Sequence, residues 1–227
     1  MGVKGATKRI GDADGRPAAG AVSAPYIGSR TANEALLDEK RMLIEAAATR
    51  CFSECGYSGT TIEQIAMHAG MSVGSIYRYV TRKQDILLLV FKRLMDLYES
   101  VLTPVIDLPL PPDRKLFEAM RAYYGIIDRE PDRALIAYRE SWALDKAGRS
   151  YIKQRELETN RYFEEIIGAG IDQGAFRPVD AHLVAYDIVL LGHMWALKGW
   201  HFRRLFTLDE YVRRQFELVM AHLTPPQ

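Results

Sequence analysis

The chain has 227 residues and a formal net charge of +1, and 48% of its residues are hydrophobic. This length fits one large domain or two small ones, and the apolar content is ample for a buried core. A nearly neutral chain does not coat nucleic acid nonspecifically, so any affinity for DNA must come from a local patch. No signal peptide is apparent, and the longest apolar run is too short to span a bilayer, which predicts a cytoplasmic protein with no membrane partner.

The first thirty residues hold five basic and two acidic residues and show no apolar periodicity. Such a segment cannot bury enough surface to offset the entropy that it loses on ordering. We therefore predict a flexible tail over residues 1–32. Two roles stay open for it, an arm that reaches a DNA groove and a plain solvated extension, and we favour the second.

A first helix is expected from Asn33 or Asp38 to Glu54, because apolar residues recur there at helical spacing. Gly56 follows and is a suitable residue to end it. This helix would support the segment that comes next.

The segment Thr60 to Lys83 carries the signals of two short helices joined by a tight turn. Thr60 and Thr61 each stand three residues before a Glu or a Gln, which is the pattern of a capping box at a helix start. Gly70 can adopt the left-handed conformation that ends a helix, and Ser72 can cap the next one. This arrangement predicts a helix-turn-helix, whose second helix enters the major groove of DNA.

The second helix has the composition of a DNA-contacting element. Residues 72–84 contain no acidic side chain, and small or hydroxylated residues stand at the N-terminal end. Ile76 and Val80 are four residues apart and would face inward. The residues left to contact DNA are then Val73, Ser75, Tyr77, Arg78 and Tyr79.

The run TIEQIAMHAGMSVGSIYRYVTRKQDIL resembles the DNA-binding signature of the tetracycline-repressor (TetR) family of bacterial transcriptional regulators. The resemblance covers about residues 38–91, and Val80 departs from it because the family usually has Phe there. It implies a three-helix DNA-binding domain over residues 33–84, followed by a helical ligand-binding and dimerisation domain over residues 85–227. It also implies phosphate contacts from Thr61, Ser72, Tyr77, Tyr79 and Lys83, and base contacts from Val73, Gly74 and Ser75.

The rest of the chain predicts helices only, so the expected fold class is all-α. A connecting helix should cover residues 85–102, and the proline-rich stretch 102–113 should be a non-helical break and the best domain boundary. The later helices are expected at Asp113–Asp128, Asp132–Leu144, Ser150–Ile171, from Asp180 onward, and Leu208–Leu223.

The last two of these helices predict a homodimer. Between Leu183 and Leu197 only Asp187 and His193 are plainly polar, so every side of this helix needs an apolar neighbour. Packing against the same two helices of a second subunit would supply it in a four-helix interface. Burial inside a larger monomeric core is the alternative.

Aromatic residues crowd the C-terminal half, which fits either an ordinary core or an apolar ligand cavity. For a cavity we expect Tyr123, Trp142, His193 and Trp195 to be lining residues, because they combine ring area with a polar atom. The segment WALKGWHFRR places Lys198, Arg203 and Arg204 beside aromatic area. These cations suggest an acyl-coenzyme A, with its phosphates near the cations.

No motif for a nucleophile, a metal centre or a phosphate loop is apparent, so we predict neither an enzyme nor a cofactor. His182 and His193 lie three helical turns apart and cannot share one metal ion without further ligands. The overall prediction is a repressor that a small hydrophobic or acyl-CoA-like effector releases from a palindromic DNA operator. The alternatives are a helical protein-binding adaptor without operator affinity and, last, an all-helical enzyme.

Overall fold

The computed structural model describes residues 25, 27–28 and 34–225. The tail expected over residues 1–32 therefore lies almost wholly outside the described residues. The described helices are α1 (Glu34–Gly59), α2 (Ile62–Ala69), α3 (Val73–Ile76), α4 (Lys83–Ile106), α5 (Pro112–Arg129), α6 (Pro131–Glu140), the 3₁₀ turn η1 (Ser141–Ala143), α7 (Lys146–Asp172), α8 (Ala181–Leu197), α9 (Gly199–Phe202) and α10 (Leu208–Leu223).

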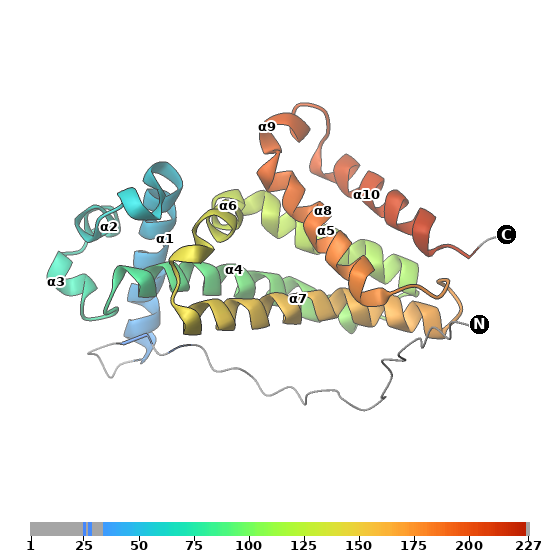
Figure 1. Ribbon diagram of the computed structural model, residues 1–227, viewed down its shortest axis with the longest axis horizontal. Coiled ribbons are helices and arrows are strands. Elements are labelled where there is room, and N and C mark those ends of the chain that lie inside the picture. Colours follow the sequence, from blue (N-terminus) through green and yellow to red (C-terminus); the bar gives the residue numbers. More distant parts are fainter. Residues whose placement is uncertain (1–24, 26, 29–33, 226–227) are drawn as a thin grey trace, which may run out of the picture.

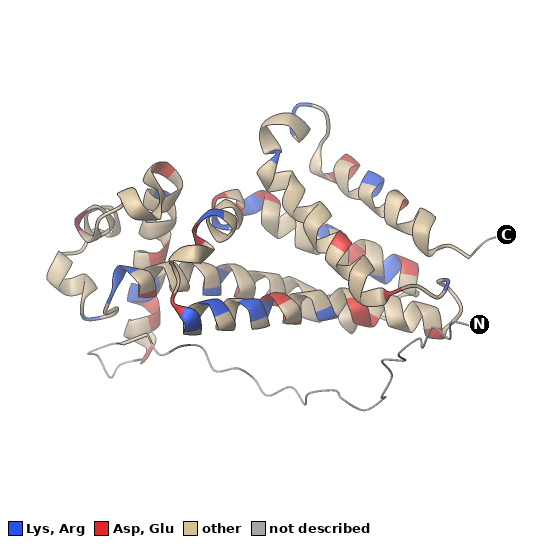
Figure 2. Ribbon diagram, in the orientation of Figure 1, with Lys and Arg blue, Asp and Glu red and all other residues tan. Residues whose placement is uncertain are grey.

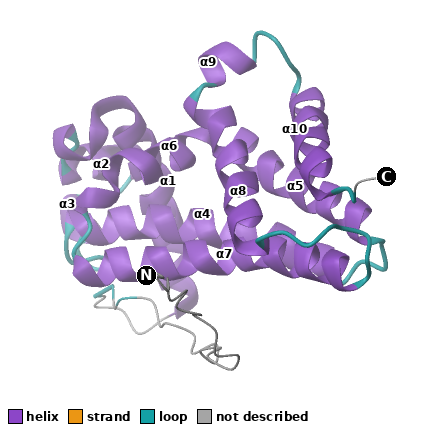
Figure 3. Cartoon of the chain, turned by 45° about the vertical axis from the view of Figure 1, so that its right-hand side comes forward, coloured by secondary structure: helices purple, strands orange, loops and turns teal. Residues whose placement is uncertain are grey.

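The helices form a small head and a longer body. We call α1–α3 the head, which lies at one end of the molecule, and α4–α10 the body (Figure 1). Helix α4 leads out of the head and runs beside α7, while α5 contacts α4, α7, α8 and α10 and is central to the body. All secondary structure in the described part of the chain is helical (Figure 3), which confirms the predicted all-α class.

The head shares its core with the first half of α4. Ile44 and Phe52 of α1, Ile65 of α2 and Ile76 of α3 are buried together with Ile86–Phe91. Burying side chains of this size contributes about 1.5–3 kcal/mol each. The domain boundary expected after residue 84 stays a prediction. The first half of α4 is buried in the core of the head, and its second half is buried in the core of the body.

The break expected over residues 102–113 is shorter than predicted. Helix α4 continues through Pro104 and ends at Ile106. A proline inside a helix removes one hydrogen bond and crowds the preceding turn, but Leu102 and Val105 on this last turn are buried in the body core. That burial offsets the lost bond, so the chain leaves the helix only at Asp107.

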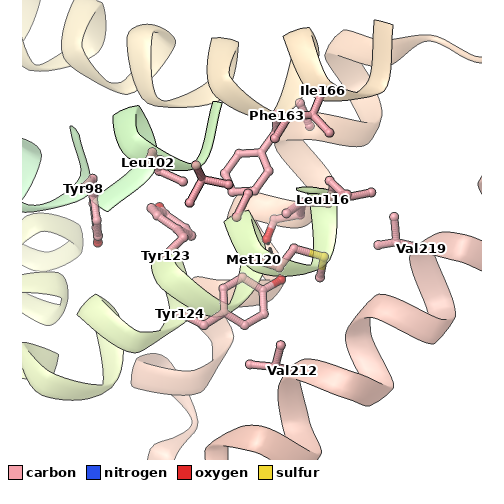
Figure 4. Close-up of a cluster of buried hydrophobic side chains, with 14 of the residues drawn as sticks. Tyr98, Leu102, Leu116, Met120, Tyr123, Tyr124, Phe163, Ile166, Val212 and Val219 are labelled. Carbon is pink, nitrogen blue, oxygen red and sulfur yellow. Dashed lines mark hydrogen bonds between the residues drawn. The ribbon is translucent and has the colours of Figure 1, made fainter. Parts of the chain in front are cut away.

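The body core is centred on α5. Its buried residues Leu116, Met120, Tyr123, Tyr124 and Ile127 recur at helical spacing. Figure 4 shows four of them surrounded by side chains from α4, α7 and α10. The hydroxyls of Tyr123 and Tyr124 bring polar atoms into this otherwise apolar core.

Helix α7 starts earlier than expected, at Lys146 instead of Ser150. The Asp145 side chain caps it by accepting a hydrogen bond from the Gly148 backbone amide at 2.8 Å. This cap gives a hydrogen-bond acceptor to one of the backbone amides that have no partner at a helix start, and it therefore favours the additional helical turn.

Candidate functional sites

The predicted caps of the helix-turn-helix are confirmed. The Gln64 amide donates to the Thr61 hydroxyl at 3.3 Å, and the Thr61 amide donates to the Gln64 side chain at 2.8 Å, which completes the capping box of α2. Gly70 ends α2 with a φ of 64°, a left-handed value that glycine adopts without a Cβ clash. Ser72 then caps α3 through a 3.1 Å bond from the Ser75 amide.

Helix α3 is shorter than the segment 72–84, which the sequence predicts as the DNA-contacting helix. It is a regular helix only over Val73–Ile76 and continues as a turn, in which the Tyr79 amide donates to the Ile76 carbonyl at 2.9 Å. This is a tightened i to i+3 bond of the kind found at helix ends. Ile76 and Val80 are fully buried, as their spacing predicted.

The exposed side of α3 carries no formal charge. Ser72, Gly74 and Tyr77 are exposed, while Val73 and Ser75 are half-buried. Figure 2 shows no charged residue on the ribbon of α3, and the blue of Lys and Arg gathers in the segment that leads into α4. Arg78 in that segment is exposed and donates to the Ser75 hydroxyl at 2.7 Å. The surface therefore combines an uncharged, closely approachable face with cations at its edge.

Two of the expected DNA-contacting residues hold the head together. The Tyr79 side chain is buried, and its carbonyl accepts a 3.1 Å bond from Arg41. The Lys83 ammonium lies over the Tyr57 ring and donates to the carbonyls of Tyr57 and Thr60, both at 2.8 Å. A cation at the C-terminal end of α1 stabilises carbonyls that have no helical partner.

The body contains a cavity of about 320 Å³ between α4, α5, α6, η1, α7 and α8. Its surface is mostly apolar, and Arg149 and Lys153 are exposed cations on its α7 side. This volume is at the lower end of the range for ligand pockets, which is roughly 300–1,000 Å³. The principal lining residues are Leu94, Met95, Tyr98, Tyr123, Ala137, Tyr138, Leu144, Arg149, Ile152, Lys153, Glu156, Asn160, Tyr186, Val189 and His193.

A histidine between two tyrosines forms the polar part of this cavity. The Tyr123 hydroxyl lies 2.7 Å from His193 Nε2, and the Tyr138 hydroxyl lies 2.7 Å from Nδ1. Burial lowers the pKa of His193 to about 4, because the surroundings disfavour its charged form. Burial also raises the pKa of the Tyr123 and Tyr138 hydroxyls. The three groups are therefore neutral at pH 7.

The cavity brings together only part of the expected lining set. Tyr123 and His193 line it, whereas Trp142 is 63% exposed and Trp195 is buried elsewhere. The Trp195 indole donates to Asp128 at 2.8 Å, and the Arg203 guanidinium lies 5.3 Å from its ring. The sequence reasoning missed the lining residues Tyr98 and Asn160.

Neither missed residue has a recognisable signal in the chain. Tyr98 belongs to a helix that was expected only to connect the two domains, and Asn160 stands in the polar stretch of α7. The cations of the segment 198–204 also lie outside the cavity lining, and the lining cations come from α7 instead.

Helix α6 joins the cavity to the head. Its Ala137 and Tyr138 line the cavity, and its Arg133 forms a two-bond ion pair with Glu45 of α1, with both N···O distances 2.9 Å. The two side chains are only 15% and 8% exposed. Thr49 donates a further 2.9 Å bond to Glu45, so the carboxylate is well satisfied.

A second set of bonds joins the two ends of α6 to α1. The Ser53 hydroxyl donates to Asp132 at 2.8 Å, and the Tyr57 amide donates to Glu140 at 3.3 Å. Helix α6 is therefore bonded to α1 at both of its ends, and α1 in turn packs against α2 of the helix-turn-helix.

Within the described residues, no group of three or more His, Cys, Asp or Glu side chains is placed to hold a metal ion. Among the helices described, none is both long and apolar enough to cross a membrane.

Comparison with known sequences identifies both parts of the chain. Residues 44–90 match the profile of "Bacterial regulatory proteins, tetR family", and residues 109–202 match that of "Tetracyclin repressor-like, C-terminal domain". The HTH-type transcriptional regulator HbdR of Aromatoleum sp. (strain CIB) is 40% identical over 198 residues, which cover 87% of this chain and 86% of HbdR.

Two further relatives are more distant. The HTH-type transcriptional repressor KstR2 of Mycobacterium tuberculosis (strain ATCC 25618 / H37Rv) is 28% identical over 144 residues, 63% of this chain and 72% of KstR2. Among solved structures, AibR in complex with isovaleryl coenzyme A and operator DNA superposes with a TM-score of 0.68 at 23% identity. That match covers 83% of this chain and 100% of AibR, and it shows a shared fold.

Proposed function

We propose that this chain, which belongs to the tetR family of bacterial regulatory proteins, is a repressor that an acyl-coenzyme A releases from its DNA operator. As a member of this family, the chain is a DNA-binding transcriptional regulator. We propose repression over activation because the relative KstR2 is named a transcriptional repressor. We place this activity in the cytoplasm, where bacterial operators lie.

One observation carries the release mechanism, namely that α6 contributes to the cavity and is bonded to the head. A ligand that fills the space beside Tyr138 acts on the helix whose Arg133 holds Glu45. A ligand changes DNA affinity only if it binds one arrangement of the two parts more tightly than the other. The coupling free energy in such systems is typically about 1–3 kcal/mol.

Three features support an acyl-CoA as the effector. The cavity interior is mainly apolar and suits an acyl group, and Arg149 and Lys153 are cations on its α7 side. Guanidinium and ammonium groups pair well with phosphates such as those of coenzyme A. The AibR structure, which shares this fold, contains isovaleryl coenzyme A. No charged group of the ligand needs to enter the apolar part.

The DNA-contacting surface that we propose is narrower than the family signature. Ser72 and Tyr77 suit phosphate oxygens, and exposed Gly74 allows close approach of the backbone to the groove. Thr61, Val73, Ser75 and Arg78 complete the surface. The contacts of Tyr79 and Lys83 within the head favour a structural role for both residues, in which they position α3. Lys83 uses two of its three N–H groups in these contacts and keeps the third for a phosphate.

The exposed apolar face of α8 supports a homodimer. Leu183, Leu190 and Leu197 recur every seven residues, so they lie along one side of the helix, and they are 59%, 50% and 36% exposed. Leu218 of α10 is 60% exposed. Pairing α8 and α10 with their copies would cover these side chains and place two α3 helices on one palindromic site, about 34 Å apart or somewhat more.

The test is a binding experiment with DNA from beside the gene that encodes the chain. Fluorescence anisotropy of a labelled duplex should rise with purified protein, and short acyl-CoAs should reverse the rise, while free coenzyme A should not. Sedimentation velocity should give a dimer. A protein that never binds the duplex would instead be an adaptor, and binding that no acyl-CoA reverses would exclude the effector class.

A further inference from the structure

Two buried polar atoms on the cavity wall lack a partner. The Tyr98 hydroxyl and Asn160 Oδ1 form no hydrogen bond with any described residue, and each residue is only 1% exposed. The Tyr98 ring packs on Tyr123 with 4.5 Å between ring centroids. The two hydroxyls influence each other electrostatically, but their contact does not meet hydrogen-bond geometry, so the Tyr98 hydroxyl can still bond to a ligand. A buried polar atom destabilises the protein unless it is hydrogen-bonded, so a bound polar group that reached these two atoms would be stabilised by them.

The chemistry that each atom requires is defined. The Asn160 side-chain amide donates from Nδ2 to Glu164 at 2.6 Å, and a carboxylate only accepts, so the orientation of the Asn160 amide is set. Its Oδ1 therefore needs a donor. The Tyr98 hydroxyl can donate and needs an acceptor. One uncharged group that both donates and accepts would satisfy the pair.

The neighbouring histidine adds a second donor. A neutral imidazole has one N–H and one bare nitrogen, so His193 accepts a hydrogen bond from only one of Tyr123 and Tyr138 and donates one to the other. The tyrosine that accepts the imidazole N–H keeps its own hydroxyl hydrogen free. This part of the wall thus offers up to two hydroxyl donors and one amide acceptor.

The polar wall lies away from the cations of the cavity. Arg149 and Lys153 are eleven and seven residues from Asn160 on α7, which is about 16 Å and about 10 Å along a helix at 1.5 Å per residue. Among the described residues that line the cavity, Arg149 and Lys153 are the only Lys or Arg side chains. A second carboxylate on the acyl group is therefore disfavoured at this wall, because it would meet Asn160 Oδ1 without a compensating cation.

We propose that the cavity is specific for acyl thioesters with a neutral hydroxyl substituent on a short chain or single ring, and that Tyr98 and Asn160 bind this hydroxyl. The inference rests on the acyl-CoA function proposed above and adds the class of acyl group. The modest cavity volume of about 320 Å³ argues for a short acyl group over a long fatty chain.

The test uses pairs of effectors that differ by one hydroxyl. One pair is butyryl-CoA and 3-hydroxybutyryl-CoA, and a ring set is benzoyl-CoA with its hydroxylated isomers. At least one hydroxylated compound should release the DNA duplex at about tenfold lower concentration than its parent, which is the size of effect expected from one or two satisfied hydrogen bonds.

Two variants assign the effect to the wall. Tyr98→Phe removes only the hydroxyl and should abolish the preference, while release by the unsubstituted parent is retained. Tyr124→Phe is the matched control, since Tyr124 is equally buried but its hydroxyl donates to the Ile188 carbonyl and it does not line the cavity. The control should keep the preference.

The outcomes separate the two proposals. Equal release by every parent and its hydroxylated partner would overturn the hydroxyl preference, as expected if a bound water satisfies both atoms, while the acyl-CoA function would stand. A preference that survives in Tyr98→Phe would overturn the assigned wall. Release by none of these thioesters would overturn the effector class and this inference with it.

Discussion

The head and the cavity differ in how their residues are distributed along the chain. The helix-turn-helix is built from residues 60–83, and each cap bonds groups three residues apart. The cavity instead draws its lining from Leu94 through His193, on five helices and a 3₁₀ turn. A site made from neighbours in sequence depends mainly on local bonds, whereas a site made from distant helices depends on how these helices pack.

The ion pair between Glu45 of α1 and Arg133 of α6 is a buried link between the two regions, and breaking it should have the largest effect. In Arg133→Leu the Glu45 carboxylate keeps its Thr49 bond but loses its buried counter-ion, which typically costs about 3–5 kcal/mol. Denaturant unfolding followed by circular dichroism would measure this loss.

The double variant Glu45→Leu/Arg133→Leu separates stability from signalling. It removes both charges, so it should recover most of the stability, yet the DNA complex should respond less to effector. A double variant with unchanged stability and unchanged release would show that α6 does not transmit the signal through this pair.

The pH dependence of stability should distinguish the body from the head. The pKa of His193 is about 4 in the folded state and 6.5 in the reference state, so the unfolded chain binds the proton first as the pH falls. Stability from this group is complete above pH 6.5 and is lost between pH 6.5 and 4, at up to about 1.4 kcal/mol per pH unit. The difference in unfolding free energy between wild type and His193→Gln should shrink over that window, and a constant difference would contradict the buried neutral state.

Matched caps offer a direct comparison of the two regions. Thr61 caps α2 in the head and Thr207 caps α10 in the body, each with the same capping box. Replacing either threonine by Ala should cost about 1 kcal/mol of stability. Only Thr61→Ala should also weaken operator binding in anisotropy titrations, because α2 positions α3 and Thr61 itself belongs to the proposed DNA-contacting surface. Equal losses of DNA affinity in both variants would show that affinity follows overall stability.

The smallest effect is expected from Tyr77→Phe. Tyr77 is 43% exposed, so removing its hydroxyl should leave the unfolding free energy unchanged. One hydrogen bond to a phosphate would be lost, which should weaken operator binding by about 0.5–1.5 kcal/mol, or roughly 2- to 12-fold. Tyr57→Phe serves as the control, because it removes a tyrosine hydroxyl of the head but keeps the ring and the carbonyl that contact Lys83. Unchanged affinity in Tyr77→Phe would remove this residue from the proposed surface.

The helix-turn-helix was predictable because its signals are local. Thr61 and Ser72 each accept a bond from the amide three residues later, and the Gly70 amide donates to the carbonyls of Met67 and Ala66, so the roles of all three follow from residue type and spacing. The helices of the body were predictable in number and approximate position, apart from the short α9. Their boundaries moved where packing outweighed local preference, as in α4, which continues through Pro104 because Leu102 and Val105 are buried.

The cavity was not predictable in the same way, because no local pattern tells whether an aromatic side chain faces a core, a cavity or solvent. Trp142 and Trp195 look alike in sequence, yet the first is exposed and the second is bonded to Asp128 in the core. The polar atoms of Tyr98 and Asn160 are buried and unpaired only because other helices pack around them. The amino-acid order alone therefore determined the fold class and the DNA-binding element, and the packing of distant helices determined the effector site, since burial is a property of the assembled chain.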